Sequence, residues 1–239
     1  MEEWFRSWFG SLYEELYRHR DPLEAARQVA SLLSLTGKHL GPVLDAGCGG
    51  GRHLGCLREQ GCQAFGLDLS SHLLARAVED LRGPVVCADL RSPPFHPGAF
   101  GLVASFFTGF GYLDTPEDDA RFFHQLAALV KPGGWLFLDL PNPARVRQDL
   151  VARDERAIEG GRAIQEREIV GNLVIKTIRV ERVGQVPEQY FERVRLWEIE
   201  DIDRLATACG LISRAILGDS EGSLATPESP RQAFLWRKE

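Results

Sequence analysis

The sequence has little that would direct the chain to a membrane or to a nucleic acid. It contains no run of about 18 apolar residues, and its opening MEEWFRSWFG is acidic, unlike the basic first region of a secretory signal peptide. The net charge is −6 and the pI is about 5.6, whereas proteins that follow a phosphate backbone need an excess of lysine and arginine. We therefore expect a soluble cytoplasmic protein that binds neither membranes nor nucleic acids.

Cysteine is sparse as well, and the remaining composition is that of an ordinary folded domain. The five cysteines, at 48, 56, 62, 87 and 209, are odd in number and contain no C-x-x-C pair. A disulfide framework and a zinc site are therefore not expected, and we predict no metal site. A chain of 239 residues, 44% of them hydrophobic, can bury the core of an α/β domain with an insertion.

The stretch most informative about function is VLDAGCGGGRH at residues 43–53. A short apolar run leads into closely spaced glycines, and helix-forming residues follow, so the pattern predicts a strand, a tight turn and a helix. Glycines are needed where the backbone takes φ > 0 or where another molecule approaches closely, and the helix start adds unpaired N–H groups. We therefore predict that a ligand binds here, at Asp45, Ala46, Gly47, Cys48, Gly49, Gly51 and Arg52.

Two kinds of cofactor are bound by such a turn, and the spacing of the glycines distinguishes them. The dinucleotide fingerprint G-x-G-x-x-G places its third glycine where this chain has Arg52. Asp45 precedes the first glycine, and its carboxylate there would repel a pyrophosphate and attract an α-amino group or a sulfonium. The spacing therefore favours a cationic ligand, with a nicotinamide-dependent reductase as the alternative.

With these residues, VLDAGCGGGRH resembles motif I of the class I S-adenosylmethionine (SAM)-dependent methyltransferases. The stretch LAALVKPGGWLFLD at 126–139 is similar to the later L-K-P-G-G motif of that family, and the opening WF…LY…RD resembles a bacterial small-molecule branch of it. The resemblance implies an α/β fold with a Rossmann-like, seven-stranded sheet, helices on both faces and an antiparallel last strand. It also implies SAM as cofactor and S-adenosylhomocysteine (SAH) as product.

Acids are expected at the ends of the second and third strands. Asp68 follows the predicted strand 63–67 about 20 residues after the turn, where a carboxylate can accept hydrogen bonds from both ribose hydroxyls of an adenosine. The resemblance assigns Asp89, after the predicted strand 85–88, to the adenine amino group. The expected nucleoside contacts are Asp68, Leu69, Asp89 and Leu90.

The end of the fourth predicted strand, at 100–106, indicates what kind of acceptor to expect. The resemblance places Phe106 and Phe107 around the transferred methyl group. Enzymes of this kind that methylate nucleobase amino groups carry Asn/Asp-Pro-Pro-Tyr/Phe at this place, and SFFT at 105–108 does not match it. We therefore expect a small-molecule acceptor.

An aromatic stripe along residues 4–16 predicts an amphipathic helix whose apolar face must be covered. We interpret residues 1–37 as an N-terminal helical lid that also packs on the rest of the protein. Tyr13 and Arg20 of this lid are expected to reach the cofactor, and Arg20 could pair with the SAM carboxylate.

The remaining chain is predicted to form two units. Residues 38–145 and 198–239 are expected to make the SAM-binding domain. Residues 146–197 alternate polar and apolar side chains, which predicts an inserted antiparallel subdomain after the fifth strand. Its three predicted strands are 163–169, 173–183 and 190–197. The resemblance to small-molecule methyltransferases implies that this sheet roofs the acceptor site.

The resulting hypothesis is a SAM-dependent methyltransferase that acts on a small-molecule acceptor by in-line displacement. Besides the reductase, a SAM-binding protein without turnover is an alternative. No spacing identifies a catalytic base, and the candidates are Tyr112, His19 and Tyr190. The aromatic stripe leaves both a monomer and a homodimer open.

Overall fold

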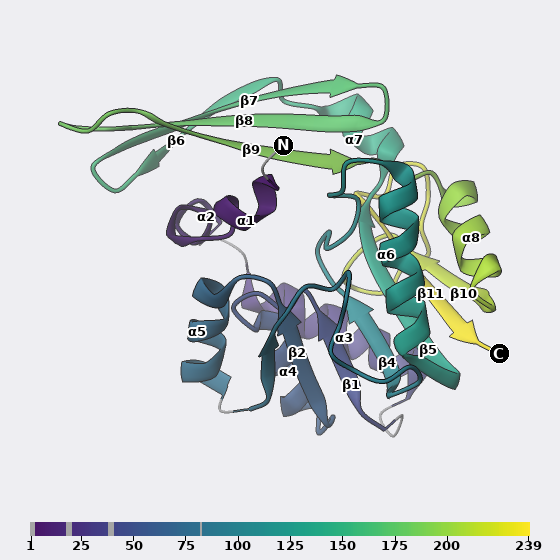
Figure 1. The fold of residues 1–239 in the computed structure, drawn as a ribbon. Coiled ribbons are helices and arrows are strands. Elements are labelled where there is room, and N and C mark those ends of the chain that lie inside the picture. The colour runs from purple at the N-terminus through teal and green to yellow at the C-terminus, as the bar shows by residue number, and fades with distance from the viewer. Residues whose placement is uncertain (1–2, 18–20, 38–40, 82) are drawn as a thin grey trace.

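A seven-stranded sheet forms the centre of the computed structural model, which describes residues 3–17, 21–37, 41–81 and 83–239 (Figure 1). Its order is β10-β11-β5-β4-β1-β2-β3, and β11 runs antiparallel to both of its neighbours. The strands are β1 (Val43–Ala46), β2 (Ala64–Asp68), β3 (Val85–Cys87), β4 (Phe100–Ser105), β5 (Val130–Pro141), β10 (Leu211–Leu217) and β11 (Arg231–Lys238). The predicted Rossmann-like sheet with its antiparallel last strand is confirmed.

Strands β1 and β4 at the middle of the sheet are buried along their whole length. Their nearly continuous apolar sequences suit this position, because a parallel strand is covered on both faces. The chain runs outward from β1 to β3 and then returns to β4 on the other side of β1. Such a reversal opens a crevice at the carboxyl ends of the strands, where α/β proteins bind ligands.

Helices cover the sheet on both faces. One apolar cluster joins the sheet to α3 (Pro22–Thr36), α4 (Arg52–Glu59) and α5 (Ser71–Leu81). A second joins it to α6 (Pro116–Leu129) and α8 (Ile199–Ala208). Within the described ranges, none of the helices is both long enough and apolar enough to cross a membrane.

The N-terminal segment differs from the predicted lid of residues 1–37. The stripe folds as two short helices, α1 (Trp4–Trp8) and α2 (Ser11–Leu16), because the backbone is extended at Gly10, with φ −128° and ψ −157°. Helix α3 packs on the main sheet through Val29, Leu32 and Leu33. Its N-terminus is capped by Asp21, which accepts a hydrogen bond of 2.8 Å from the backbone N–H of Leu23.

The insertion contains more structure than expected. It comprises α7 (Pro143–Asp149), β6 (Arg153–Ile158), β7 (Gly161–Val170), β8 (Leu173–Arg182) and β9 (Glu188–Arg195), which form a four-stranded antiparallel sheet. The predicted number of three strands was wrong. Strand β6 was missed because its sequence, RDERAI, is almost entirely polar and so lacks the alternation that identifies a half-buried strand.

The expected roof does not lie directly over the main sheet. Helices α1 and α2 lie between the β6–β9 sheet and the seven-stranded sheet with its helices (Figure 1). Trp8, Leu12 and Leu16 of the aromatic stripe pack against Ala163, Ile178 and Val180 on the inner face of the inserted sheet. The apolar stripe is therefore buried within its own chain, as amphipathic helices usually are.

Candidate functional site

A cavity of about 940 Å³ opens at the carboxyl ends of the central strands, beneath α1 and α2. This volume is at the upper end of the range for small-molecule sites, about 300–1,000 Å³. Most of the predicted site residues line it: Tyr13, Gly47, Cys48, Gly49, Arg52, Asp68, Leu69, Asp89, Leu90, Phe106, Phe107 and Tyr112. The cavity therefore brings together residues from four strand ends and the N-terminal helices.

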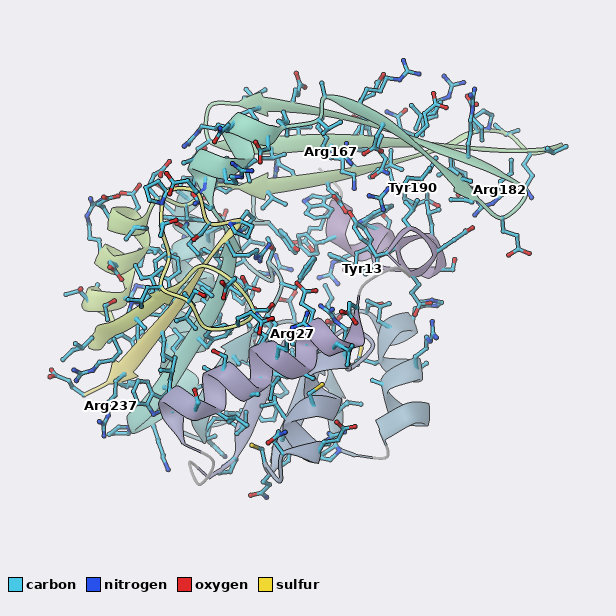
Figure 2. The ribbon with its side chains drawn as sticks, turned by 180° about the vertical axis from the view of Figure 1, so that it is seen from behind. Tyr13, Arg27, Arg167, Arg182, Tyr190 and Arg237 are labelled. Carbon is cyan, nitrogen blue, oxygen red and sulfur yellow. The ribbon has the colours of Figure 1, made fainter. Side chains whose placement is uncertain are left out.

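Six predicted residues are not seen at this cavity. Asp45, Ala46, Gly51 and Tyr190 are outside its described lining. His19 and Arg20 lie outside the described residues. The hydroxyl of Tyr190 donates to Glu188 at 2.5 Å, and this bond raises the pKa of Tyr190 to about 12. Tyr190 points toward the N-terminal helices, with its ring centroid 5.6 Å from that of Trp8 (Figure 2).

The glycine turn is shaped by backbone conformations that glycine adopts without strain. Gly47, Gly49 and Gly51 have φ of 83°, 51° and 84°. The backbone N–H groups of Gly47 and Cys48 both donate to the carbonyl of Leu67, at 2.8 and 3.1 Å, which fixes the turn against β2. The start of α4 at Arg52 therefore lies at the cavity edge.

Gly66 on β2 packs closely against the glycine turn and the start of α4. A Cβ at this position would lie 2.7 Å from both Cys48 Sγ and Leu54 Cδ2. We expect Gly66→Ala to lower the free energy of unfolding by about 1–3 kcal/mol, because these buried side chains must move, and to weaken SAH binding through the displaced turn. Urea unfolding measures the loss. Gly50→Ala, whose Cβ meets nothing within 4 Å, is the stability control, and equal stabilities would contradict the prediction.

Asp68 joins the turn to the second strand. One carboxylate oxygen accepts from Gly49 N and the other from Ser70 N, each at 2.8 Å. Burial raises the pKa of Asp68, and the backbone hydrogen bonds oppose this effect. A carboxylate has about four lone-pair sites, so each oxygen retains an acceptor position for a hydroxyl in the cavity. The residue thus fits its predicted ribose contact.

Asp45 lies behind the turn and is 1% exposed. Its Oδ2 has no hydrogen-bond partner among the described residues. Burial, followed by repulsion from Asp68, raises the pKa of Asp45 to about 7. An orphaned carboxylate oxygen under a glycine turn suits a cationic group, although Asp45 does not face the cavity directly.

Asp89, the predicted adenine contact, lines the cavity and is already paired. Arg91 donates to both carboxylate oxygens, with Nη2 at 2.6 Å from Oδ2, and these bonds lower the pKa of Asp89. The other side of the Arg91 guanidinium binds Glu3, with Nη2 at 3.1 Å from Oε2, and Arg6 of α1 lies 3.4 Å from Asp89. We call these four residues the ionic latch, because they tie α1 to the end of β3.

Helix α2 is held over the cavity in the same manner. Glu14 binds Arg76 of α5 at 3.0 Å and His72 at 2.9 Å, and Ser70 donates to the carbonyl of Phe9 at 2.7 Å. On its other side, Glu15 binds Arg182 of the inserted sheet at 3.2 Å (Figure 2). The aromatic stripe predicted a covered helix, but the acids that anchor it gave no separate sequence signal.

The wall formed after β4 is aromatic. Phe106 stacks on His53 with ring centroids 4.2 Å apart, and the ring of Tyr112 meets that of Trp4 at 5.1 Å. The Tyr112 hydroxyl donates to the carbonyl of Thr108. Among the described residues, no three His, Cys, Asp or Glu side chains are grouped to hold a metal ion. The chemistry that this site can perform is therefore alignment of bound molecules against an aromatic wall.

Comparisons with known proteins agree with this geometry. A family described as a methyltransferase domain matches residues 43–134. The dTDP-3-amino-3,4,6-trideoxy-alpha-D-glucopyranose N,N-dimethyltransferase of Streptomyces venezuelae is 29% identical over 157 residues, 62% of this chain and 65% of that protein. The chain thus spans just under two thirds of the length of this curated relative.

Solved structures share the fold over nearly the whole chain. A SAM-dependent methyltransferase from Clostridium acetobutylicum superposes with a TM-score of 0.80 at 18% identity, covering 95% of this chain and 96% of that one. SAM-bound CalS10, an amino pentose methyltransferase from Micromonospora echinaspora, has a TM-score of 0.72 at 21% identity, covering 96% and 97%. These matches give no support to the reductase alternative. Residues 43–134 thus resemble a methyltransferase domain, and the whole chain has the fold of the class I SAM-dependent methyltransferases.

Proposed function

We propose that the protein transfers a methyl group from SAM to a small-molecule acceptor by in-line displacement. The observation that carries this proposal is the arrangement of Asp68, Asp89 and the glycine turn around one cavity. Asp68 has free acceptor positions for ribose hydroxyls, and the orphaned Oδ2 of Asp45 suits the cationic end of SAM. The residues present therefore fit the cofactor.

The proposed binding mode follows the order of the strand ends. The turn at Gly47 to Gly51 would hold the amino acid end of SAM, Asp68 the ribose, and the segment Asp89-Leu90 the adenine. Because both oxygens of Asp89 are engaged by Arg91, its contact to adenine would use the lone pairs that remain. Leu69, Arg52 and Tyr13 complete the enclosure, and Arg20 remains a proposed partner of the SAM carboxylate.

When bound, SAM supplies a methyl group activated by the sulfonium charge. The residues of this chain have to align the acceptor atom and exclude water, which can account for much of the rate enhancement. Phe106 and Phe107 would contact the reacting centre. If the acceptor loses a proton, Tyr112 is the described candidate that lines the cavity, with its own proton held by the Thr108 carbonyl.

Helices α1 and α2 act as a lid in this proposal. The lid residues Phe5, Phe9 and Tyr13 line the cavity, and the ionic latch closes its adenine end. SAM could then enter and SAH leave when the latch opens.

The latch makes a prediction about salt. Its side chains are between 27% and 49% exposed, so their attraction is screened by ions. We expect the SAH dissociation rate to rise about threefold between 0.05 and 0.5 M NaCl, because weak surface pairs contribute about 0–1 kcal/mol each. Stopped-flow displacement measures the rate. Glu3→Gln with Arg6→Gln should remove most of the salt effect, whereas Arg204→Gln, which breaks a pair on α8, should retain it. Identical salt dependence in all three proteins would exclude a latch.

The acceptor class is proposed from the relatives. The S. venezuelae relative is named for a dTDP-linked amino sugar and CalS10 for an amino pentose. Amino sugars are therefore the first acceptors to test. The test incubates the protein with SAM carrying a tritiated methyl group and with dTDP-linked amino sugars or a metabolite extract, and it measures SAH and labelled product. Methyl transfer supports the proposal, whereas bound SAM without any SAH formation would indicate a SAM-binding protein without turnover.

The proposal also covers the class of acceptor, the cellular location and the oligomeric state. The acidic net charge of −6 and the absence of a nucleobase-type motif after β4 support an acceptor other than nucleic acid. We place the protein in the cytoplasm, away from membranes, as a monomer or homodimer. Sedimentation velocity of the purified protein distinguishes the two oligomeric states.

A further inference from the structure

The segment that follows β4 contains two adjacent residues in a strained conformation. Phe107 and Thr108 have φ of 53° and 66°, in the left-handed region that favours glycine. A non-glycine residue there costs about 1–3 kcal/mol and persists only where its surroundings hold it. Both residues line the cavity, next to Phe106 and Gly109. The strain therefore lies at the crevice between β1 and β4.

The carboxyl end of β5 supplies what holds this turn. Asp139, 2% exposed at its side chain, accepts a hydrogen bond from Phe107 N through Oδ2 at 3.0 Å. Its backbone carbonyl accepts from Thr108 N, also at 3.0 Å. One residue of a central strand thus fixes both strained peptide groups.

The first residue of β11 completes the arrangement. Arg231 donates from Nε to Asp139 Oδ1 at 2.7 Å and from Nη2 to Thr108 Oγ1 at 2.9 Å. Its guanidinium also lies 5.1 Å from the centre of the Phe107 ring. Arg231 therefore contacts the Asp139 carboxylate, the Thr108 hydroxyl and the Phe107 ring at the same time.

A third connection comes from the helices on one face of the sheet. Gln28 of α3 donates to Asp139 Oδ2 at 3.0 Å and meets His53 Nε2 through Oε1 at 3.0 Å. His53 of α4 stacks on Phe106 with an interplanar angle of 1°. The rings of Phe106 and Phe107 are thereby connected through one hydrogen-bonded network. Its members Gln28, Asp139 and Arg231 are outside the described cavity lining.

We infer that Asp139 and Arg231 are positioning residues for methyl transfer: they hold the Phe107–Thr108 turn in its left-handed form, so that the aromatic wall faces the reacting methyl group in a fixed geometry. This role rests on the proposed function. It requires no contact between either residue and SAM or the acceptor. The same turn presents the Thr108 carbonyl to Tyr112, so the network also sets the position of that hydroxyl.

A double-mutant cycle in thermal stability tests, without any ligand, whether Asp139 supports the Phe107–Thr108 turn. Asp139→Asn should lower Tm, and the decrease should be about half as large when Thr108→Gly is already present, because glycine needs no support at positive φ. Asp119→Asn is the matched control. Asp119 is also buried and binds Arg195 at 2.9 Å, but it does not contact residues 107 or 108 in the described structure. Asp119→Asn should lower Tm by the same amount in the wild type and in Thr108→Gly. If Asp139→Asn also lowers Tm equally in these two proteins, the inference is overturned.

Methyl transfer tests the functional consequence. With an acceptor identified by the tritiated-methyl assay, Asp139→Asn and Arg231→Gln should lower kcat per folded molecule about 10- to 100-fold. The KM for SAM should change less than about threefold, as expected for misalignment. Arg231→Lys should recover part of kcat, because it keeps the charge beside Asp139. Wild-type kcat in the folded Asp139→Asn protein would overturn the positioning role. A wild-type protein that forms no SAH would instead overturn the proposed function, and this role with it.

Discussion

Replacing Asp68 with alanine is expected to weaken SAH binding about 10- to 150-fold. The loss corresponds to about 1.5–3 kcal/mol, the magnitude of hydrogen bonds to a charged group. Asp68 is the one predicted acid that both lines the cavity and joins the glycine turn to β2, through Gly49 and Ser70. Its removal would therefore abolish the proposed ribose contacts and loosen the turn proposed to hold the rest of the cofactor. Isothermal titration calorimetry with SAH measures the change.

The control for this variant also removes a carboxylate, but one that lies away from the cavity. Asp203→Asn removes a carboxylate that accepts from Trp236 Nε1 at 2.8 Å and lies outside the described cavity lining. It should bind SAH as the wild type does. An Asp68→Ala protein that folds normally and binds SAH with unchanged affinity would show that the ribose is not held here.

Asp45→Asn is expected to stabilise the protein, and to do so more as the pH rises. The folded pKa of Asp45 is about 7, above the usual value of 3.8, so between these values the folded chain keeps a proton that the unfolded chain has released. Unfolding then releases a proton, and stability falls as the pH rises from about 4 to about 7. At roughly 1.4 kcal/mol per pKa unit, the full cost above pH 7 is about 4 kcal/mol, which asparagine avoids.

The measurement is urea unfolding of both proteins between pH 4 and pH 8. The difference in unfolding free energy should be close to zero at pH 4, where both side chains are neutral, and should level off above about pH 7. A difference that does not change with pH would show that Asp45 is ionised throughout. The same variant should lose affinity for SAM at pH 8 if the buried charge attracts the cofactor's cationic end.

The sequence was most informative where local residues determine local structure. The glycines at 47, 49 and 51 all have the positive φ that their turn requires. Asp21 and Gly37 flank α3, as their capping preferences favour. The parallel strands were found because fully buried strands have continuous apolar sequences. The positions of Asp68 and Asp89 at strand ends followed from these boundaries.

Long-range contacts explain what could not be predicted. Arg91 pairs with Glu3 across 88 positions, and Arg231 binds Asp139 across 92. No periodicity relates such residues, because only the folded sheet brings them together. The left-handed turn at Phe107 and Thr108 was missed for the same reason, since its residues are not turn formers and its support comes from β5 and β11. Strand β6 was hidden by its polar sequence.

Equilibrium binding of SAM, SAH and NADH to the wild-type protein tests the central claim most directly. The Asp68 carboxylate, the glycine turn and the charge of Asp45 predict that SAM and SAH bind in the cavity at one site per chain and compete with each other. They predict that NADH neither binds tightly nor displaces SAH, because Arg52 stands where a pyrophosphate-binding turn needs glycine. Tight binding of NADH with no binding of SAM would contradict the account.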